Sequence, residues 1–169
     1  MSDQIINKVA RSALQTLDLE ELFVPGERVV LDIKDHLHQG LVLKEKDFRE
    51  YIKSNDWSSY EGKHVAIQCT ADAIVPTWAF MLLSVALRPF AKTIIFGNLE
   101  QLEIQLFKDA LDKVDWDIYQ DGKVVIKGCS KVNVPVATYV EVTNRLRPIA
   151  ASIMFGEPCS TVPLFKRPM

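Results

Sequence analysis

Apolar positions along the chain switch between short continuous runs and helical spacing. The short runs predict strands at residues 29–33, 64–68, 93–96, 116–120, 123–127 and 151–155. Apolar residues at intervals of three and four predict helices at residues 3–17, 45–54, 76–88, 98–114 and 135–147. Strands that alternate with helices favour an α/β fold, which we predict to be a mostly parallel open sheet with helices on both faces.

The second half of the chain repeats part of the first at an offset of 59 residues. Residues 87–89 and 146–148 both read Leu-Arg-Pro, and residues 96–97 and 155–156 both read Phe-Gly. We therefore predict an internally duplicated β-α-β unit at about residues 64–97 and 123–156, preceded by an N-terminal helix and a short α+β segment. Length and composition predict one domain over residues 1–169, with an extension over 1–60 and the duplicated core over 61–169.

Composition excludes several classes of partner. Hydrophobic residues make up 48% of the 169 residues, charged residues 25%, and the formal net charge is −2. No long Lys/Arg run is present, which argues against a nucleic-acid partner. No apolar run approaches the ~20 residues that span a bilayer, and no export signal is visible at the N-terminus, so we expect a cytoplasmic protein with no membrane partner.

Three cysteines stand where chemistry is expected. Cys69, Cys129 and Cys159 each follow a predicted strand, and the carboxyl ends of parallel strands form the edge at which open α/β sheets bind ligands. Thiolates select Zn²⁺ or iron–sulfur clusters, so we predict that the three thiols share one metal. A closed site needs a fourth ligand, which we expect to be Asp72 first, then Glu157, Glu100 or His64.

Other interpretations of the cysteines stay open. Cysteine is often a small buried hydrophobe, and no Cys-x-x-Cys pair is present, so the three residues could be structural within a small-molecule or protein-binding module. Alternatively the chain could be a thiol enzyme that passes sulfur as a persulfide, with Cys159 as the best candidate nucleophile. The common nucleotide-binding and hydrolase motifs are missing from the sequence, so we expect no nucleotide cofactor.

Three segments carry a resemblance to a known family. They are residues 70–82, the Lys-Gly-Cys-Ser run at 127–130, and the Gly-Glu-Pro-Cys-Ser-Thr-Val-Pro run at 156–163. Together they resemble a bacterial family catalogued as domain of unknown function 2480, and the resemblance covers nearly the whole chain. It implies no activity. Members are often encoded near iron–sulfur assembly genes, which implies iron–sulfur assembly proteins as partners.

Overall fold

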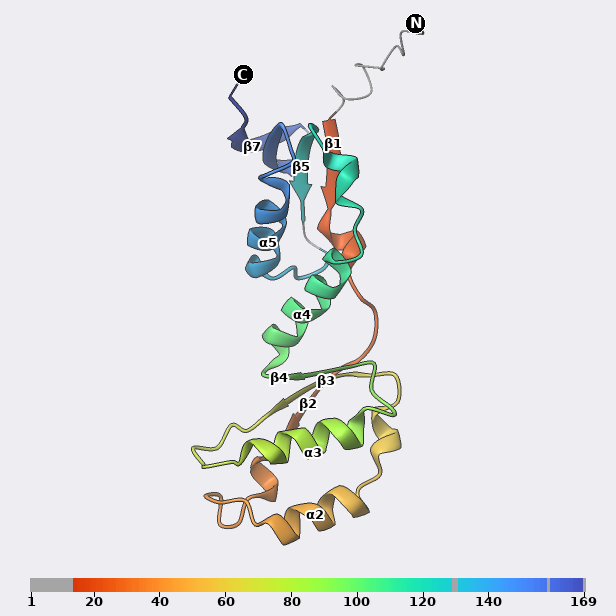
Figure 1. Cartoon of the computed structure of the whole chain (residues 1–169), viewed down its shortest axis with the longest axis vertical. Coiled ribbons are helices and arrows are strands. Elements are labelled where there is room, and N and C mark those ends of the chain that lie inside the picture. The colour runs from red at the N-terminus through yellow and green to blue at the C-terminus, as the bar shows by residue number, and fades with distance from the viewer. Residues whose placement is uncertain (1–13, 129–130, 158, 169) are drawn as a thin grey trace, which may run out of the picture. The chain divides into compact units, whose positions relative to one another are not determined.

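The computed structural model describes residues 14–128, 131–157 and 159–168 (Figure 1). Its internal contacts divide the chain into two compact units. Unit 2 is continuous and comprises residues 25–105, whereas unit 1 combines the residues up to 24 with residues 106–169. Each unit has its own β-sheet, and the described residues form four α-helices and mostly parallel strands. The fold is therefore mixed α/β, as the sequence predicted.

Unit 2 is built on a three-stranded, fully parallel sheet of order β2-β3-β4. Its elements are β2 (Arg28–Asp32), the 3₁₀ helix η2 (Ile33–His36), α2 (Glu45–Ser54), η3 (Trp57–Tyr60), β3 (His64–Gln68), α3 (Thr77–Leu87) and β4 (Thr93–Phe96). Val65 and Ile67 of β3 share one buried cluster with Ala79, Leu83 and Leu87 of α3. Because alternate residues of β3 point to the same face, this cluster fixes which face of the strand α3 covers.

Unit 1 is built on a four-stranded sheet of order β1-β5-β6-β7. Its elements are β1 (Leu14–Asp18), η1 (Leu19–Leu22), α4 (Leu99–Leu111), η4 (Trp116–Tyr119), β5 (Lys123–Lys127), α5 (Val136–Leu146), β6 (Ser152–Glu157) and β7 (Ser160–Lys166). The first three strands of the sheet are parallel, and β7 returns antiparallel along β6. Helix α4 carries residues of both units, because residues 99–105 count with unit 2 and the rest with unit 1.

Local chemistry explains where these elements begin and end. Asn98 and Gln101 form a reciprocal capping box at the start of α4, in which each side chain accepts a hydrogen bond from the other residue's backbone N–H. Gly156 has a φ of +126°, and a Cβ there would lie 2.5 Å from the carbonyl oxygen of Ser160. Gly97 also has a positive φ, +142°. Gly97 directly follows β4 and Gly156 is the last residue but one of β6, so the repeated Phe-Gly pair lies near a strand end where the positive φ favours glycine.

The two units contain the same order of elements. Each runs strand, 3₁₀ helix, α-helix, 3₁₀ helix, strand, α-helix, strand, and unit 1 then adds β7. The registers agree as well, because His64 pairs with Thr93 in unit 2 and Lys123 pairs with Ser152 in unit 1, each shifted by the same 59 residues. The correspondence concerns arrangement, and a common origin of the two units stays a prediction.

Several predictions about individual elements are wrong. Residues 14–17 belong to strand β1 instead of the predicted helix over 3–17, whose residues 3–13 lie outside the described part of the chain. The strand predicted at 116–120 is the 3₁₀ helix η4, and β7 was not predicted. The strands of the two repeats lie in two sheets instead of one. The predicted division into an extension over 1–60 and a core over 61–169 stays a prediction. The prediction of one domain over 1–169 stays a prediction.

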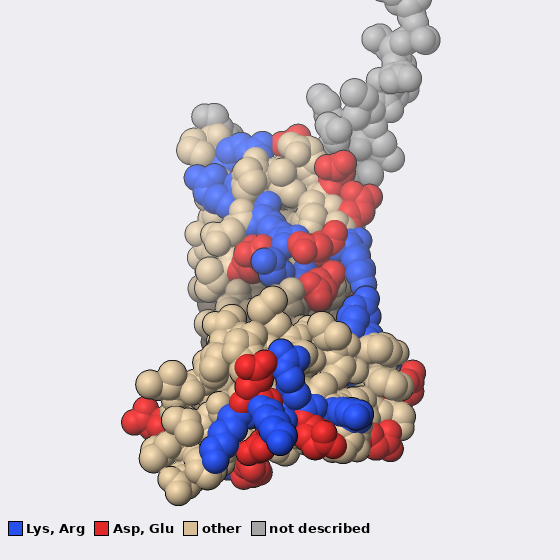
Figure 2. Space-filling view, turned by 60° about the horizontal axis from the view of Figure 1, so that its bottom comes forward, with Lys and Arg blue, Asp and Glu red and all other residues tan. Residues whose placement is uncertain are grey.

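The surface carries charges of both signs (Figure 2). Figure 2 shows Lys and Arg side chains mixed with Asp and Glu on the face that it presents, without a field of one sign there. On α2, for example, Arg49 pairs with Glu45 one turn earlier, at 2.8 Å. Among the described residues, no helix is both long enough and apolar enough to cross a lipid bilayer.

Candidate functional site at the carboxyl ends of the strands

Three charged side chains meet at the carboxyl-end edge of the unit 1 sheet. Asp18, Lys127 and Glu157 are the last residues of β1, β5 and β6, which are adjacent parallel strands. The Lys127 ammonium lies 3.5 Å from a carboxylate oxygen of Asp18 and 3.7 Å from one of Glu157. The side chain of Glu157 is about half exposed, at 49%, so this carboxylate is accessible to a ligand. We call this group the unit 1 edge.

Two cysteines lie next to the unit 1 edge along the chain. Cys159 is exposed and stands in the turn between β6 and β7, two residues after Glu157. Cys129 follows Lys127 by two residues and lies outside the described residues. A side chain at Gly128, between them, would collide with the hydroxyl of Tyr139 from α5. Tyr139 therefore lies against the backbone that leads to Cys129.

The third cysteine belongs to unit 2. Cys69 directly follows β3, is partly buried against the unit 2 core, and directs its thiol to the carbonyl oxygen of Ala71 at 3.7 Å. The sheet register aligns Cys69 with Gly128 instead of Cys129, because β3 ends at Gln68 and β5 at Lys127. Strand β3 belongs to the unit 2 sheet, whereas β5 and β6 belong to the unit 1 sheet. The expectation that all three cysteines follow strands of one sheet is therefore wrong. Whether their sulfur atoms share a metal stays a prediction.

The predicted oxygen and nitrogen ligands are divided in the same way. Asp72 is exposed in the loop after Cys69 of unit 2, whereas Glu157 belongs to the unit 1 edge. Glu100 is exposed in the first turn of α4. His64 is buried, and its ring nitrogens lie 3.0 Å from the Thr93 hydroxyl and 3.0 Å from the carbonyl oxygen of Pro25. His64 is thus held by the protein on both sides. Within the described ranges, no three of the His, Cys, Asp and Glu side chains are grouped closely enough to hold a metal ion.

The carboxyl-end edge of unit 2 is built around Asp32, the last residue of β2. Its carboxylate accepts hydrogen bonds from the Thr70 hydroxyl at 2.5 Å and from the backbone N–H groups of Thr70 and Lys34. Burial by itself raises the pKa of Asp32, but the hydrogen bonds from Thr70 and Lys34 outweigh it, so the pKa lies below its ordinary value of 3.8. Asp32 therefore ties the loop after Cys69 to β2.

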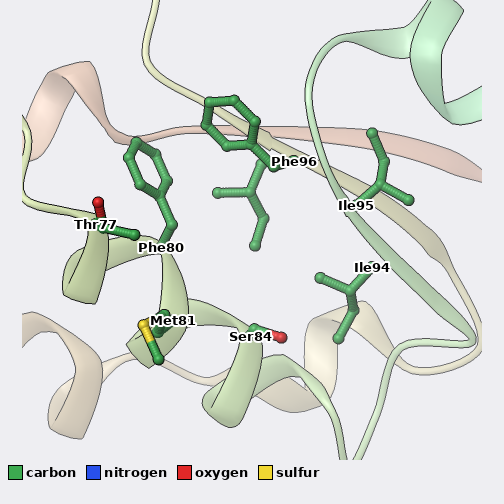
Figure 3. Close-up of a pocket in the computed structure, with 8 residues that line it drawn as sticks. Thr77, Phe80, Met81, Ser84, Ile94, Ile95 and Phe96 are labelled. Carbon is green, nitrogen blue, oxygen red and sulfur yellow. The ribbon is translucent and has the colours of Figure 1, made fainter.

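Sequence reasoning missed an apolar groove in unit 2. A cavity of about 450 Å³ opens between α3 and β4 (Figure 3). The rings of Phe80 and Phe96 meet edge to face there, with centroids 4.9 Å apart. The lining contains no charged side chain and consists of Ile67, Thr77, Phe80, Met81, Ser84, Ile94, Ile95 and Phe96. The sequence of α3 could have indicated this groove. Residues 78–83 are all apolar, which is typical of a helix covered on more than one side.

Comparisons with known proteins give a family without an activity. The family model described as "Protein of unknown function (DUF2480)" matches residues 3–167 of this chain. No curated protein and no solved structure matches it. The match confirms the resemblance drawn from the sequence motifs and adds no substrate, metal or partner.

Proposed function

The chain belongs to the DUF2480 family, and from this premise we propose that it is an accessory protein that binds Zn²⁺ or an iron–sulfur cluster through cysteine thiolates. The proposal places the principal ligands at the unit 1 edge: the thiolates of Cys129 and Cys159 and the carboxylate of Glu157. The observation that carries it is the position of Cys159, exposed in a turn two residues after an accessible Glu157. The sequence also predicted Cys69 and Asp72 of unit 2 as ligands. The proposal leaves them out of this set, and the C69S variant tests that choice.

The donor set fits such a metal. Thiolates select Zn²⁺ and iron–sulfur centres, and a carboxylate is also a common zinc ligand. Two thiolates and one carboxylate leave a fourth position for water or for a ligand from a partner, which suits a protein that carries or passes on a metal. The proposed link to iron–sulfur assembly proteins rests on the gene neighbourhood that the family resemblance implies.

Lys127 gives the proposal a second point of contact. Its ammonium holds the carboxylate of Glu157 at 3.7 Å, and a bound metal ion would compete with it for that carboxylate. Replacing Lys127 with methionine removes the competitor and leaves most of the side-chain volume in place. We therefore expect K127M to bind Zn²⁺ more tightly than the unmodified chain, and E157Q to bind it more weakly.

Elemental analysis of protein purified without chelator tests the proposal. We expect about one equivalent of zinc, or iron with the absorption of a cluster, and loss of that metal in the C129S/C159S variant. C69S serves as the matched control, because it removes one thiol from unit 2. Metal that persists in C129S/C159S contradicts the proposal. Loss in C69S alone contradicts the assignment to unit 1. Circular dichroism checks that each variant is folded.

A thiol enzyme is the second candidate, favoured by the exposure of Cys159, which stands two residues after the carboxylate that pairs with Lys127. Here the thiolate of Cys159 attacks the outer sulfur of a donor persulfide. The S–S bond of the donor breaks, the donor leaves as a thiolate, and Cys159 carries the persulfide. The rate of alkylation at neutral pH separates the two candidates. If the chain is a thiol enzyme, we expect Cys159 in metal-free protein to react faster than a model thiol. A rate at or below that of the model thiol contradicts it.

We also propose that the two units are copies of one β-α-β unit, with helices on both faces of each sheet. The support is the shared offset of 59 residues in sequence motifs and strand registers. The hydrogen bond of Trp57 to the carbonyl oxygen of Ile52 also recurs at this offset, as that of Trp116 to Leu111.

A further inference from the structure

The groove of unit 2 lies beside a strand that has a partner on one side only. In the three-stranded sheet, β4 pairs with β3 and no described strand of the unit pairs with its other side. The N–H of Gly97, just after β4, donates to the carbonyl oxygen of Ile67 on β3. Because backbone groups alternate along a strand, the N–H groups of Ile94 and Phe96 point to the outer side. An extended segment could hydrogen-bond there.

Unit 1 shows what covers the same edge. Strand β6 holds the place of β4, and β7 pairs with it antiparallel, with Phe165 opposite Ile153. Phe165 packs against the unit 1 core, and the Arg147 guanidinium lies over its ring at 3.8 Å. Ile94 is the counterpart of Ile153 in unit 2, where it lines the open groove. Unit 2 therefore lacks, among its described residues, the antiparallel strand that completes unit 1.

The surface around this edge is unusually apolar for one that faces water. Met81 and Val85 of α3 are 63% and 72% exposed, and Phe96 of β4 is 69% exposed. Strand β4 reads Thr-Ile-Ile-Phe, without the lysine, proline or bulge by which proteins protect an exposed edge. Apolar edges and patches of this kind mark interaction surfaces.

We infer that the edge of β4 and the groove beside α3 form the interface of a symmetric homodimer. A two-fold axis that brings β4 against its own copy makes the two strands antiparallel, which is the direction of β7 on β6. The pairing joins two three-stranded sheets into one of six strands. It also brings the exposed residues of α3, Met81 and Val85, towards their symmetry mates. The proposal is independent of the thiol site.

Charge at the ends of β4 fits this occupant. Lys92 precedes the strand and Glu100 follows it in the first turn of α4, and both are exposed. In an antiparallel pair the start of one strand lies near the end of the other. The proposed pairing therefore brings Lys92 towards the partner's Glu100, and the same approach recurs on the other side of the axis. A second copy thus satisfies the backbone, the apolar groove and the flanking charges together.

Sedimentation velocity on the full chain over a range of concentrations tests the inference. We expect a species of twice the chain mass of 19.2 kDa, which dissociates on dilution. M81E and F96K change exposed residues at the interface, so we expect each to weaken dimerisation by at least about 30-fold. V140E is the matched control, since Val140 holds the place of Met81 on α5 of unit 1 and is 56% exposed. We expect it to leave dimerisation unchanged.

Charge exchange keeps the inference testable if those variants fold poorly. We expect K92E alone to weaken the dimer, and K92E combined with E100K to restore it, because the pair is reformed with reversed sign. A wild-type chain that stays monomeric at every concentration overturns the inference, whether or not another protein occupies the groove. So does a dimer that persists in M81E and F96K, or one that V140E weakens equally.

Discussion

The two units share an interior and differ at their edges. In both, a short sheet of mostly parallel strands packs against helices with buried residues at corresponding positions. For example, Leu87 at the end of α3 and Leu146 at the end of α5 are both fully buried. At the edges, unit 1 carries β7 and an exposed Cys159. In unit 2, no described strand covers the outer side of β4, and Cys69 is partly buried. The interiors are alike because the same elements follow one another in the same order in both units. We therefore look for separate functions at the edges, where the units differ.

The largest expected effect tests whether the two cores are separate. Their buried clusters share no residue. We expect L87A to lower the free energy of unfolding of unit 2 by about 2–5 kcal/mol, and L146A to do so for unit 1. Hydrogen exchange resolved to β3 and β5 measures this. Equal loss of protection in β3 and β5 for both variants would show that the interiors unfold as one.

Removing the Phe165 ring from the unit 1 core should make that unit resemble unit 2. F165A deletes the side chain that packs against the core and under Arg147. We expect a loss of about 2 kcal/mol in the stability of unit 1, measured by urea denaturation, and new binding of a hydrophobic dye. L164A, at an exposed neighbour in β7, is the control. An F165A variant as stable as the unmodified chain would mean that β7 does not complete the unit 1 core.

A matched pair of tryptophans tests the likeness of the interiors more finely. W57F and W116F each delete an indole N–H, which donates to the carbonyl oxygen of Ile52 at 2.8 Å or of Leu111 at 3.0 Å. We expect each variant to lose about 1 kcal/mol by thermal denaturation. Strongly unequal losses would indicate that the two contacts support different structures.

The smallest expected effect concerns the pH dependence of stability at the carboxyl-end edge of unit 2. Because the pKa of Asp32 is lowered in the fold, its stabilisation is present above its ordinary value of 3.8 and is lost as the pH falls through the folded pKa. T70V removes the hydroxyl that donates to this carboxylate. We expect the pKa of Asp32 in T70V to rise towards 3.8 in a carboxyl-detected NMR titration. An unchanged pKa of Asp32 would rule out control by Thr70.

Local pattern was sufficient for the elements that are held by local chemistry. Helix α2 and strands β3, β4 and β5 have the residue bounds that the sequence predicted. Strand β1 was mistaken for part of a helix because it is defined by its pairing with β5, whose first residue, Lys123, is far along the chain from Leu14. Strand β7 was missed because Pro163 lowers strand propensity. The sheet accommodates Pro163 opposite Met154, next to a register shift in the pairing.

The candidate sites were predicted to different degrees. The sequence predicted that Cys69 and Cys159 follow strands, and the structure confirms this for both. The sequence did not reveal that the two cysteines belong to two different sheets. Strands β1 and β2 both precede the repeats, and β1 pairs with β5 whereas β2 pairs with β3. The groove beside β4 needed the structure, since whether an edge is covered depends on which strands pair, and the 59-residue offset does not reveal that.

Hydrogen exchange at the outer edge of β4 tests the central comparison most directly. If a second copy supplies to unit 2 what β7 supplies to unit 1, the amides of Ile94 and Phe96 will be protected at high protein concentration and will exchange rapidly on dilution. Protection along β6 will stay the same at every concentration. Rapid exchange of Ile94 and Phe96 at all concentrations, or protection that dilution does not change, would contradict the account.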